Sequence, residues 1–155
     1  MTYTDLFIQD FSDAAFQQAF RLYFAEMGVE VKEEQWPALF EQMTSEGGNA
    51  AYVRLSPAGE VIGFIQFTMI ELTNWFFNWP MGFVREFWVS PSERGQGHGK
   101  DLLQKAEAYF AAQGAARSIL TTDSAEAFYL HCGYRKASDI AAKNNDIVLL
   151  KDLNL

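Results

Sequence analysis

The stretch Arg94-Gly95-Gln96-Gly97-His98-Gly99-Lys100 separates two segments with different periodicities. Residues 84–89 before it (VREFWV) are β-branched and aromatic, which indicates a strand. Residues 101–110 after it repeat apolar side chains at helical spacing. A glycine-rich loop therefore joins the end of a strand to the start of a helix. Glycine lets the backbone approach a ligand closely, and the N–H groups of a first helical turn favour a phosphate or a diphosphate.

Two common nucleotide-binding motifs do not fit this loop. The dinucleotide fingerprint needs Gly-x-Gly-x-x-Gly, whereas Gly95, Gly97 and Gly99 alternate. The Walker loop needs Ser or Thr after its Gly-Lys pair, and Asp101 follows Lys100 here. A flexible surface turn is the remaining alternative to a phosphate site.

The pattern Arg/Gln-x-x-Gly-x-Gly/Ala does fit, at Arg94, Gly97 and Gly99. It resembles the acetyl-coenzyme A signature of the GNAT superfamily of N-acetyltransferases. A second segment, residues 125–134 (AEAFYLHCGY), is similar to the later Ala-x-x-x-Tyr-x-x-x-Gly-Phe/Tyr segment of that family. The resemblance covers residues 50–151 well and the first fifty residues in outline.

The expected elements follow the order β-α-α-β-β-β-α-β-α-β-β, which indicates an α/β layered fold. The GNAT acyl-CoA N-acyltransferase fold has this order, with a mixed central sheet and helices on both faces, in a single domain spanning residues 1–155. Ser12 is the expected N-cap of a helix over residues 13–27 that ends at Gly28. A second helix is expected over residues 32–44, and a late strand over residues 134–140.

Composition excludes several classes of function. Hydrophobic residues make up 49% of the 155 residues, enough for a core, and the single Cys excludes an internal disulfide. Two His residues make a metal-binding His cluster improbable. The amino terminus shows no signal pattern, and no apolar run approaches the ~20 residues that span a membrane. We therefore expect a cytoplasmic protein without a metal.

Net charge also limits the partners. A net charge of −8 argues against nucleic acid, whose phosphates need a basic surface. It is compatible with a cationic acceptor such as an amine, although solubility alone explains an acidic surface equally well. The acidic residues Glu26, Glu30, Glu33 and Glu34 favour a small cationic acceptor slightly.

The resemblance implies how acetyl-CoA would be held. Backbone N–H groups of the loop would bind the diphosphate, and Arg94 would support the loop or meet a phosphate. The preceding strand would pair with the pantetheine arm, with the Val89 N–H aimed at the thioester carbonyl. The His98 side chain is expected to face solvent. The predicted cofactor-binding residues are Phe87, Trp88, Val89, Arg94, Gly95, Gln96, Gly97, His98, Gly99 and Lys100.

Two residues are candidates for proton transfer. Tyr129 occupies the family's tyrosine position, where a phenol can donate to the departing thiolate; the alternative is a buried core aromatic. Glu86 is the candidate base, because burial on a central strand would raise its pKa; the alternatives are an ion pair or a water chain. The family often has Asn where Thr122 stands, which weakens the expectation that a side-chain amide at this position contacts the coenzyme.

The acceptor is left open by the sequence. A small-molecule or peptide amine is implied, and specificity would lie in residues 25–37, 72–82 and 138–146. The aromatic segment from Trp75 to Trp79 is interpreted as hairpin packing, a substrate wall or a homodimer contact. A non-catalytic acyl-CoA sensor and a partner-binding module remain the alternative functions.

Overall fold

The computed structural model describes residues 2–73 and 78–153. Its strands are β1 (Thr4–Ile8), β2 (Asn49–Leu55), β3 (Val61–Thr73), β4 (Asn78–Val89), β5 (Arg117–Thr122), β6 (Arg135–Lys136) and β7 (Ile147–Asp152). Its helices are α1 (Ala14–Met27), α2 (Trp36–Glu46), α3 (His98–Ala112) and α4 (Glu126–His131), with short 3-10 turns η1 (Glu33–Gln35) and η2 (Pro91–Glu93).

The seven strands hydrogen-bond in the order β1-β2-β3-β4-β5-β7-β6. The pairs β1–β2, β5–β7 and β6–β7 are antiparallel, whereas β4 and β5 are parallel. The parallel pair flanks α3 in the sequence, as predicted for a strand–helix–strand connection. The predicted element order and the mixed sheet are confirmed.

The chain forms two compact units, described here one at a time. Unit 1 contains residues 1–67 and 86–106, and unit 2 contains residues 68–85 and 107–155. Unit 1 therefore holds the end of β4, the glycine-rich loop and the first part of α3, and unit 2 holds α4.

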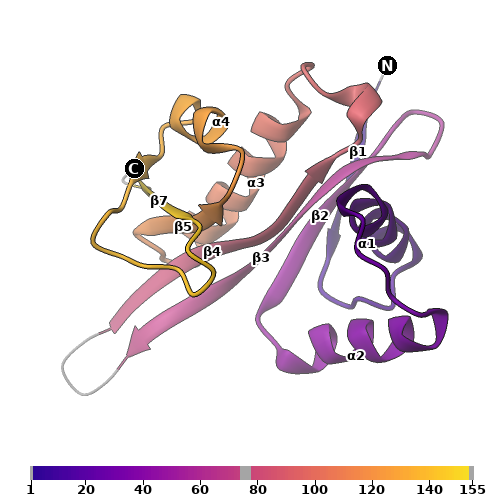
Figure 1. Cartoon of the computed structure of the whole chain (residues 1–155), viewed down its shortest axis with the longest axis horizontal. Coiled ribbons are helices and arrows are strands. Elements are labelled where there is room, and N and C mark those ends of the chain that lie inside the picture. The colour runs from indigo at the N-terminus through magenta and orange to yellow at the C-terminus, as the bar shows by residue number, and fades with distance from the viewer. Residues whose placement is uncertain (1, 74–77, 154–155) are drawn as a thin grey trace. The chain divides into compact units, whose positions relative to one another are not determined.

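The core of unit 1 lies where α1 and α2 cover one face of its strands (Figure 1). Phe16 and Phe20 of α1 are at most 2% exposed and pack with Phe40 and Phe64. Burying an aromatic side chain stabilises the fold by about 1.5–3 kcal/mol relative to leaving it exposed. These rings therefore fix α1, the helix whose last turns reach β4.

The other face of unit 1 carries a buried ion pair. Asp5 of β1 and Arg54 of β2 are directly opposite in the register. Arg54 is 6% exposed and grips Asp5 with two hydrogen bonds, Nε to Oδ1 at 2.8 Å and Nη2 to Oδ2 at 2.9 Å. Lys105 of α3 reaches the same carboxylate, with Nζ 2.9 Å from Oδ2. Helices therefore cover both faces of the strands in unit 1, as predicted.

Unit 2 is built on β5 and β7, which pair from Arg117↔Asp152 to Thr122↔Ile147. β4 joins β5 through two parallel pairs, Gly82↔Ser118 and Phe83↔Ile119. A Cβ at Gly82 would lie 2.1 Å from ring atoms of Phe110, so only glycine lets this helix approach the strand.

Several predicted boundaries were wrong. Asp13, not Ser12, caps α1, because its Oδ1 accepts from the Phe16 N–H at 3.0 Å; the Ser12 N–H donates to Asp10 instead. α2 begins at Trp36 rather than residue 32, with Pro37 in its first turn, where the missing N–H costs no hydrogen bond. Gly28 does end α1, at φ 74°.

The strands also differ from the prediction. β6 contains only Arg135–Lys136, not residues 134–140, and β4 begins at Asn78 rather than residue 84. Pro80 and Gly82 hide the start of β4, because both are uncommon inside strands. Residues 74–77 and the side chain of Trp79 lie outside the described part of the structure, so the interpretation of the Trp75–Trp79 segment stays a prediction. Among the described helices, none is long and apolar enough to cross a bilayer.

The Asp5 carboxylate makes stability depend on pH. Burial acts to raise the pKa of Asp5, but hydrogen bonds from Arg54 and Lys105 outweigh burial and lower the pKa below its ordinary 3.8. The stabilisation is complete above pH 3.8 and is lost as the pH falls through the lower pKa of the folded state.

We therefore expect Asp5→Asn to lower the free energy of unfolding by about 3 kcal/mol at neutral pH, because it leaves Arg54 buried with a weaker partner. In urea titrations the difference between wild type and variant shrinks as the pH is lowered through the depressed pKa of Asp5, below which both side chains are neutral. The exposed Asp139→Asn serves as the control, with no such trend. A difference for Asp5→Asn that is constant with pH would contradict this explanation.

Candidate functional site

The glycine-rich loop forms a sharp connection between β4 and α3. After Val89 the chain makes the 3-10 turn η2, and α3 starts at His98. Gly95 and Gly97 have φ angles of 82° and 91°, in the left-handed region that favours glycine. The predicted strand–loop–helix is therefore confirmed.

The start of α3 exposes a row of backbone donors. The first hydrogen bond into the helix runs from the Asp101 N–H to the Gly97 carbonyl at 3.1 Å. Within the described residues, the six N–H groups from Gly95 to Lys100 donate to no backbone or side-chain acceptor. Such donors, at the positive end of the helix dipole, fit an anion.

Arg94 is engaged by the protein itself. Its Nε donates to the Val89 carbonyl at 2.9 Å, and its Nη2 donates to both oxygens of Glu26 at 2.7 and 2.8 Å. The sequence left two roles open for Arg94, and this geometry favours loop support over a phosphate contact. Arg94 joins the last turn of α1 to the end of β4, where the loop begins.

Glu26 also accepts a hydrogen bond from Trp88, whose Nε1 lies 2.6 Å from Glu26 Oε1. Hydrogen bonds from Arg94 and then Trp88 lower the pKa of Glu26, so it is a carboxylate at neutral pH. Trp88 is buried at 8% exposure. One carboxylate thus holds a β4 side chain and the loop arginine together, a role that the sequence did not reveal.

The end of β4 lies very close to β3. A Cβ at Gly63 would lie 2.6 Å from the Trp88 carbonyl oxygen, so position 63 admits only glycine without movement. The Ser90 N–H donates to the Ile62 carbonyl at 2.7 Å. Because a trans peptide directs its carbonyl and its N–H oppositely, the Val89 N–H points away from β3.

Glu86 lies on β4, half-buried, and Tyr23 of α1 donates its hydroxyl to Glu86 Oε2 at 2.5 Å. Tyr23 and Glu26 are three residues apart on α1, whereas Glu86 and Trp88 are two apart on β4, so each pair shares one face. The structure thus brings Glu86, Trp88 and Arg94 together against the last turns of α1.

The expectation for the His98 side chain was wrong. It is 5% exposed, with Nδ1 3.0 Å from Arg54 Nη1 and its ring edge-on to Tyr3 at 4.6 Å. Helical periodicity could have shown this, because His98 is in step with the buried Leu102, Ala106 and Phe110. Its backbone N–H still belongs to the donor row, but its side chain anchors α3.

Tyr129 belongs to unit 2, on α4, and is 8% exposed. Burial, and secondarily the Coulombic effect of Cys132, raises the pKa of Tyr129, so the phenol stays protonated. The Tyr134 N–H donates to the Tyr129 carbonyl at 3.0 Å and closes the end of α4.

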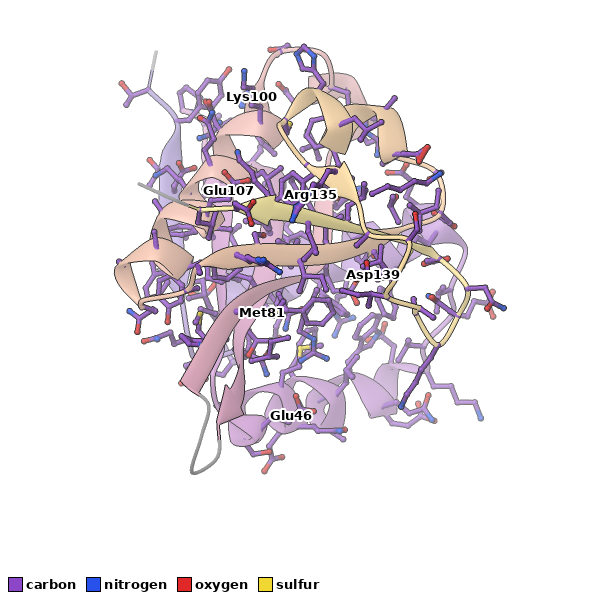
Figure 2. All side chains as sticks on the ribbon, turned by 90° about the vertical axis from the view of Figure 1, so that its left-hand side faces the viewer. Glu46, Met81, Lys100, Glu107, Arg135 and Asp139 are labelled. Atoms are coloured by element: carbon purple, nitrogen blue, oxygen red, sulfur yellow. The ribbon has the colours of Figure 1, made fainter. Side chains whose placement is uncertain are left out.

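Tyr134 is held by a polar network that the sequence did not reveal. Its hydroxyl lies 2.8 Å from Ser118 Oγ and 2.9 Å from Glu107 Oε2, and Lys151 Nζ lies 2.9 Å from Glu107 Oε1. Figure 2 shows Glu107 projecting from α3. Burial and the Glu107 charge raise the pKa of Tyr134, so this hydroxyl too remains a donor.

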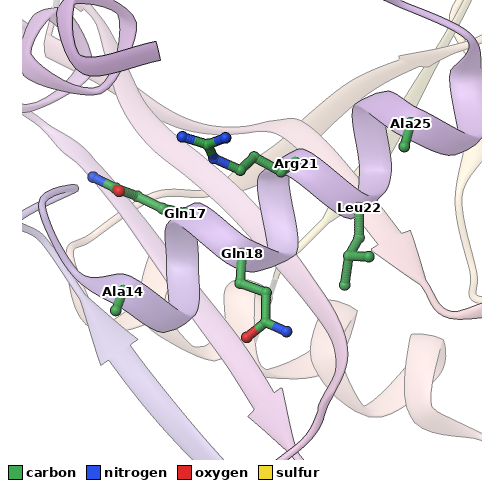
Figure 3. Close-up of a pocket in the computed structure, with 6 residues that line it drawn as sticks. All are labelled: Ala14, Gln17, Gln18, Arg21, Leu22 and Ala25. Carbon is green, nitrogen blue, oxygen red and sulfur yellow. The ribbon is translucent and has the colours of Figure 1, made fainter. Parts of the chain in front are cut away.

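Other features do not form a site. A hollow along α1 is lined by Ala14, Gln17, Gln18, Arg21, Leu22 and Ala25 (Figure 3), none of them a predicted catalytic or cofactor-binding residue. In the described residues, no three His, Cys, Asp or Glu side chains gather as a metal site would require.

Comparison with known proteins gives the same assignment as the loop. The model of the "Acetyltransferase (GNAT) family" matches residues 14–134. No curated protein is a significant match. Among solved structures, glucosamine-6-phosphate N-acetyltransferase from Arabidopsis thaliana is 18% identical over 92% of this chain and 98% of its own, with a TM-score of 0.73.

Two further structures share the fold. PaiA N-acetyltransferase from Thermoplasma acidophilum, solved with coenzyme A, is 17% identical over 98% of this chain and 99% of its own, at a TM-score of 0.65. A GNAT-family acetyltransferase from Staphylococcus aureus Mu50 is 17% identical over 99% of this chain and 100% of its own, at a TM-score of 0.69. The family model spans most of the chain and includes both the loop and the Tyr129 segment. This chain belongs to the GNAT family of acetyltransferases.

Proposed function

We propose that the protein is an acetyl-CoA-dependent N-acetyltransferase that moves the acetyl group directly to a primary amine in a ternary complex. The row of N–H groups from Gly95 to Lys100, which have no acceptor in the described part of the chain, carries this proposal, because it lies where the family signature lies. Two of the structural neighbours are named N-acetyltransferases, and one of them holds coenzyme A, which supports the choice of coenzyme.

The residues of the loop and of β4 fit such a coenzyme. The Gly95–Lys100 amides would hold its diphosphate, and a side chain at Gly95 or Gly97 would strain their left-handed backbone. Phe87, Trp88 and Val89 would line the pantetheine arm. The Val89 N–H, directed away from β3, would polarise the thioester carbonyl as it gains charge.

The bound thioester supplies an activated acetyl group and a thiolate leaving group. Glu86, oriented by Tyr23, would take a proton from the acceptor ammonium directly or through water, so that the neutral nitrogen forms the new C–N bond. As the C–S bond breaks, the Tyr129 hydroxyl would donate its proton to the sulfur. The nitrogen must also lose a second proton as the amide forms; this proton would return through water to the Tyr129 phenolate, and Glu86 would release its own proton to solvent, so the protons balance.

The acceptor remains an amine whose identity is open. Glu26 and Glu33, two of the four acidic residues thought to favour a cation, are paired with Arg94 and Arg21. The charge argument for a cationic acceptor is therefore weaker than the sequence indicated. Glu30 and Glu34 are exposed.

The activity is tested by thiol release from acetyl-CoA in the presence of a panel of small amines, amino acids and peptides. We expect release that depends on one class of amine, with a matching N-acetylated product by mass spectrometry. Tight coenzyme binding without turnover of any acceptor would favour the alternative, a non-catalytic acyl-CoA sensor.

Tyr129→Phe separates these two functions. If Tyr129 protonates the sulfur, the variant loses about 10²–10⁴-fold in kcat while its Kd for coenzyme A changes less than about twofold. Tyr109→Phe, which removes the hydroxyl of a half-buried tyrosine on α3, is the control and should keep wild-type turnover. Unchanged kcat in Tyr129→Phe would remove Tyr129 from the mechanism.

Glu86→Gln tests the base. Near neutral pH we expect kcat/KM to fall about 10²-fold or more, because the acceptor amine is mostly protonated. The deficit should shrink as the pH approaches the amine pKa of about 10, where no base is needed. A deficit of equal size at every pH would assign Glu86 a role in binding or packing instead.

A further inference from the structure

We propose that Arg54 is a positioning residue for the coenzyme loop, acting through the imidazole of His98. This inference rests on the coenzyme-binding role proposed above for residues 95–100. Arg54 lies on β2, far from the loop in the sequence and outside the two segments that resemble the family. We define the Arg54 cluster by the side chains that surround it, namely Asp5, His98, Asp101 and Lys105.

The cluster locks the beginning of α3 to the sheet. His98, Asp101 and Lys105 are three and then four residues apart, so they form one stripe along the helix. His98 Nδ1 and Asp101 Oδ2 lie 3.0 and 3.4 Å from Arg54 Nη1, and Lys105 reaches Asp5. The N-terminal turn is therefore held by one planar guanidinium that uses its three nitrogens on Asp5 and this stripe.

The contact also fixes the state of His98. A guanidinium has only donors, so Nδ1 must accept, and the imidazole is neutral with its proton on Nε2. That Nε2–H is buried and has no hydrogen-bond partner among the described residues. The carboxylate oxygen Oε2 of Glu93 lies 3.8 Å from this nitrogen, at the end of η2.

Arg54 therefore fixes the downstream end of the loop and directs an imidazole N–H toward the upstream end. Glu93 precedes Arg94, and His98 is the first residue of α3, so the two side chains bracket the residues between them. A shift of Glu93 by less than 1 Å would bring its carboxylate within the usual hydrogen-bond range of about 2.7–3.2 Å. We infer that the Arg54–His98 contact, together with the position of Glu93, sets the spacing of the amides that meet the diphosphate.

The test measures the Kd for coenzyme A by calorimetry, well below the melting temperature of each variant. Arg54→Lys keeps the charge, but one ammonium cannot hold both Asp5 and His98 in the geometry of the guanidinium fork. We expect Arg54→Lys to weaken binding about tenfold and His98→Leu to weaken it similarly. His98→Gln, which retains an acceptor for Arg54, should bind within about threefold of wild type.

Arg21→Lys is the matched control, because Arg21 also donates to both oxygens of a carboxylate, Glu33, but in a surface ion pair whose side chains are 39% and 80% exposed. It should bind coenzyme A as wild type does. In the double variant Arg54→Lys/His98→Leu, the loss should not exceed that of the worse single variant, because both changes break one link. Long-range nitrogen NMR of the imidazole, in a His131→Gln background, should show the Nε2–H form of His98, with that preference lost in Arg54→Lys.

The outcomes separate the two proposals. If the wild-type protein does not bind coenzyme A, the proposed function and this inference are both overturned. If the wild type binds coenzyme A and Arg54→Lys or His98→Leu binds it equally well, only the inference is overturned. The inference is also overturned if the fold-increase in Kd of the double variant equals the product of the two single fold-increases. A lower melting temperature with an unchanged Kd would make the cluster merely structural. Should Arg54→Lys not fold, the contrast between His98→Leu and His98→Gln decides.

Discussion

Consecutive N–H groups from Gly95 to Lys100 begin a helix without acceptors among the residues that the structure describes, and the rest of unit 1 is arranged around this constraint. Such N–H groups can bind an anion well only if their positions relative to one another stay fixed. Glycine makes the sharp entry to the helix possible but also makes the loop entropically costly to hold. The fold must therefore anchor the loop from outside, and it does so with side chains that are distant in the sequence.

The anchors are charged or polar at both ends of the loop. Upstream, Glu26 binds Arg94 and Trp88, which ties α1 to the end of β4. Downstream, Arg54 binds His98 and Asp5, which ties α3 to β1 and β2. Removing one member of the buried Arg54–Asp5 pair leaves an uncompensated charge, a far larger effect than loss of the exposed Arg94–Glu26 pair. The downstream anchor is therefore the stiffer of the two.

The features that neighbouring residues determine could be predicted from the sequence. The loop, the order of elements and the end of α1 at Gly28 could be read from spacing and glycine placement. The family resemblance brought Tyr129 forward as a candidate, and the expected burial on a central strand brought Glu86 forward. Arg54, Tyr23 and Glu26 could not be predicted, because their partners lie 44 to 68 residues away and depend on how strands and helices pack. His98 was within reach of helical periodicity, yet a polar residue beside glycines favoured a surface interpretation. β4 was shortened in the prediction because Pro80 and Gly82 are rare in strands, whereas here the Phe110 ring requires Gly82.

We have proposed that the backbone amides of the loop bind the diphosphate of coenzyme A. The most direct measurement is the movement of backbone amide NMR signals on adding coenzyme A, compared with pantetheine, which lacks the diphosphate. We predict large shifts for the amides of residues 95–100 with coenzyme A and small ones with pantetheine. This proposal is contradicted if these amides do not move with coenzyme A, or if pantetheine moves them equally.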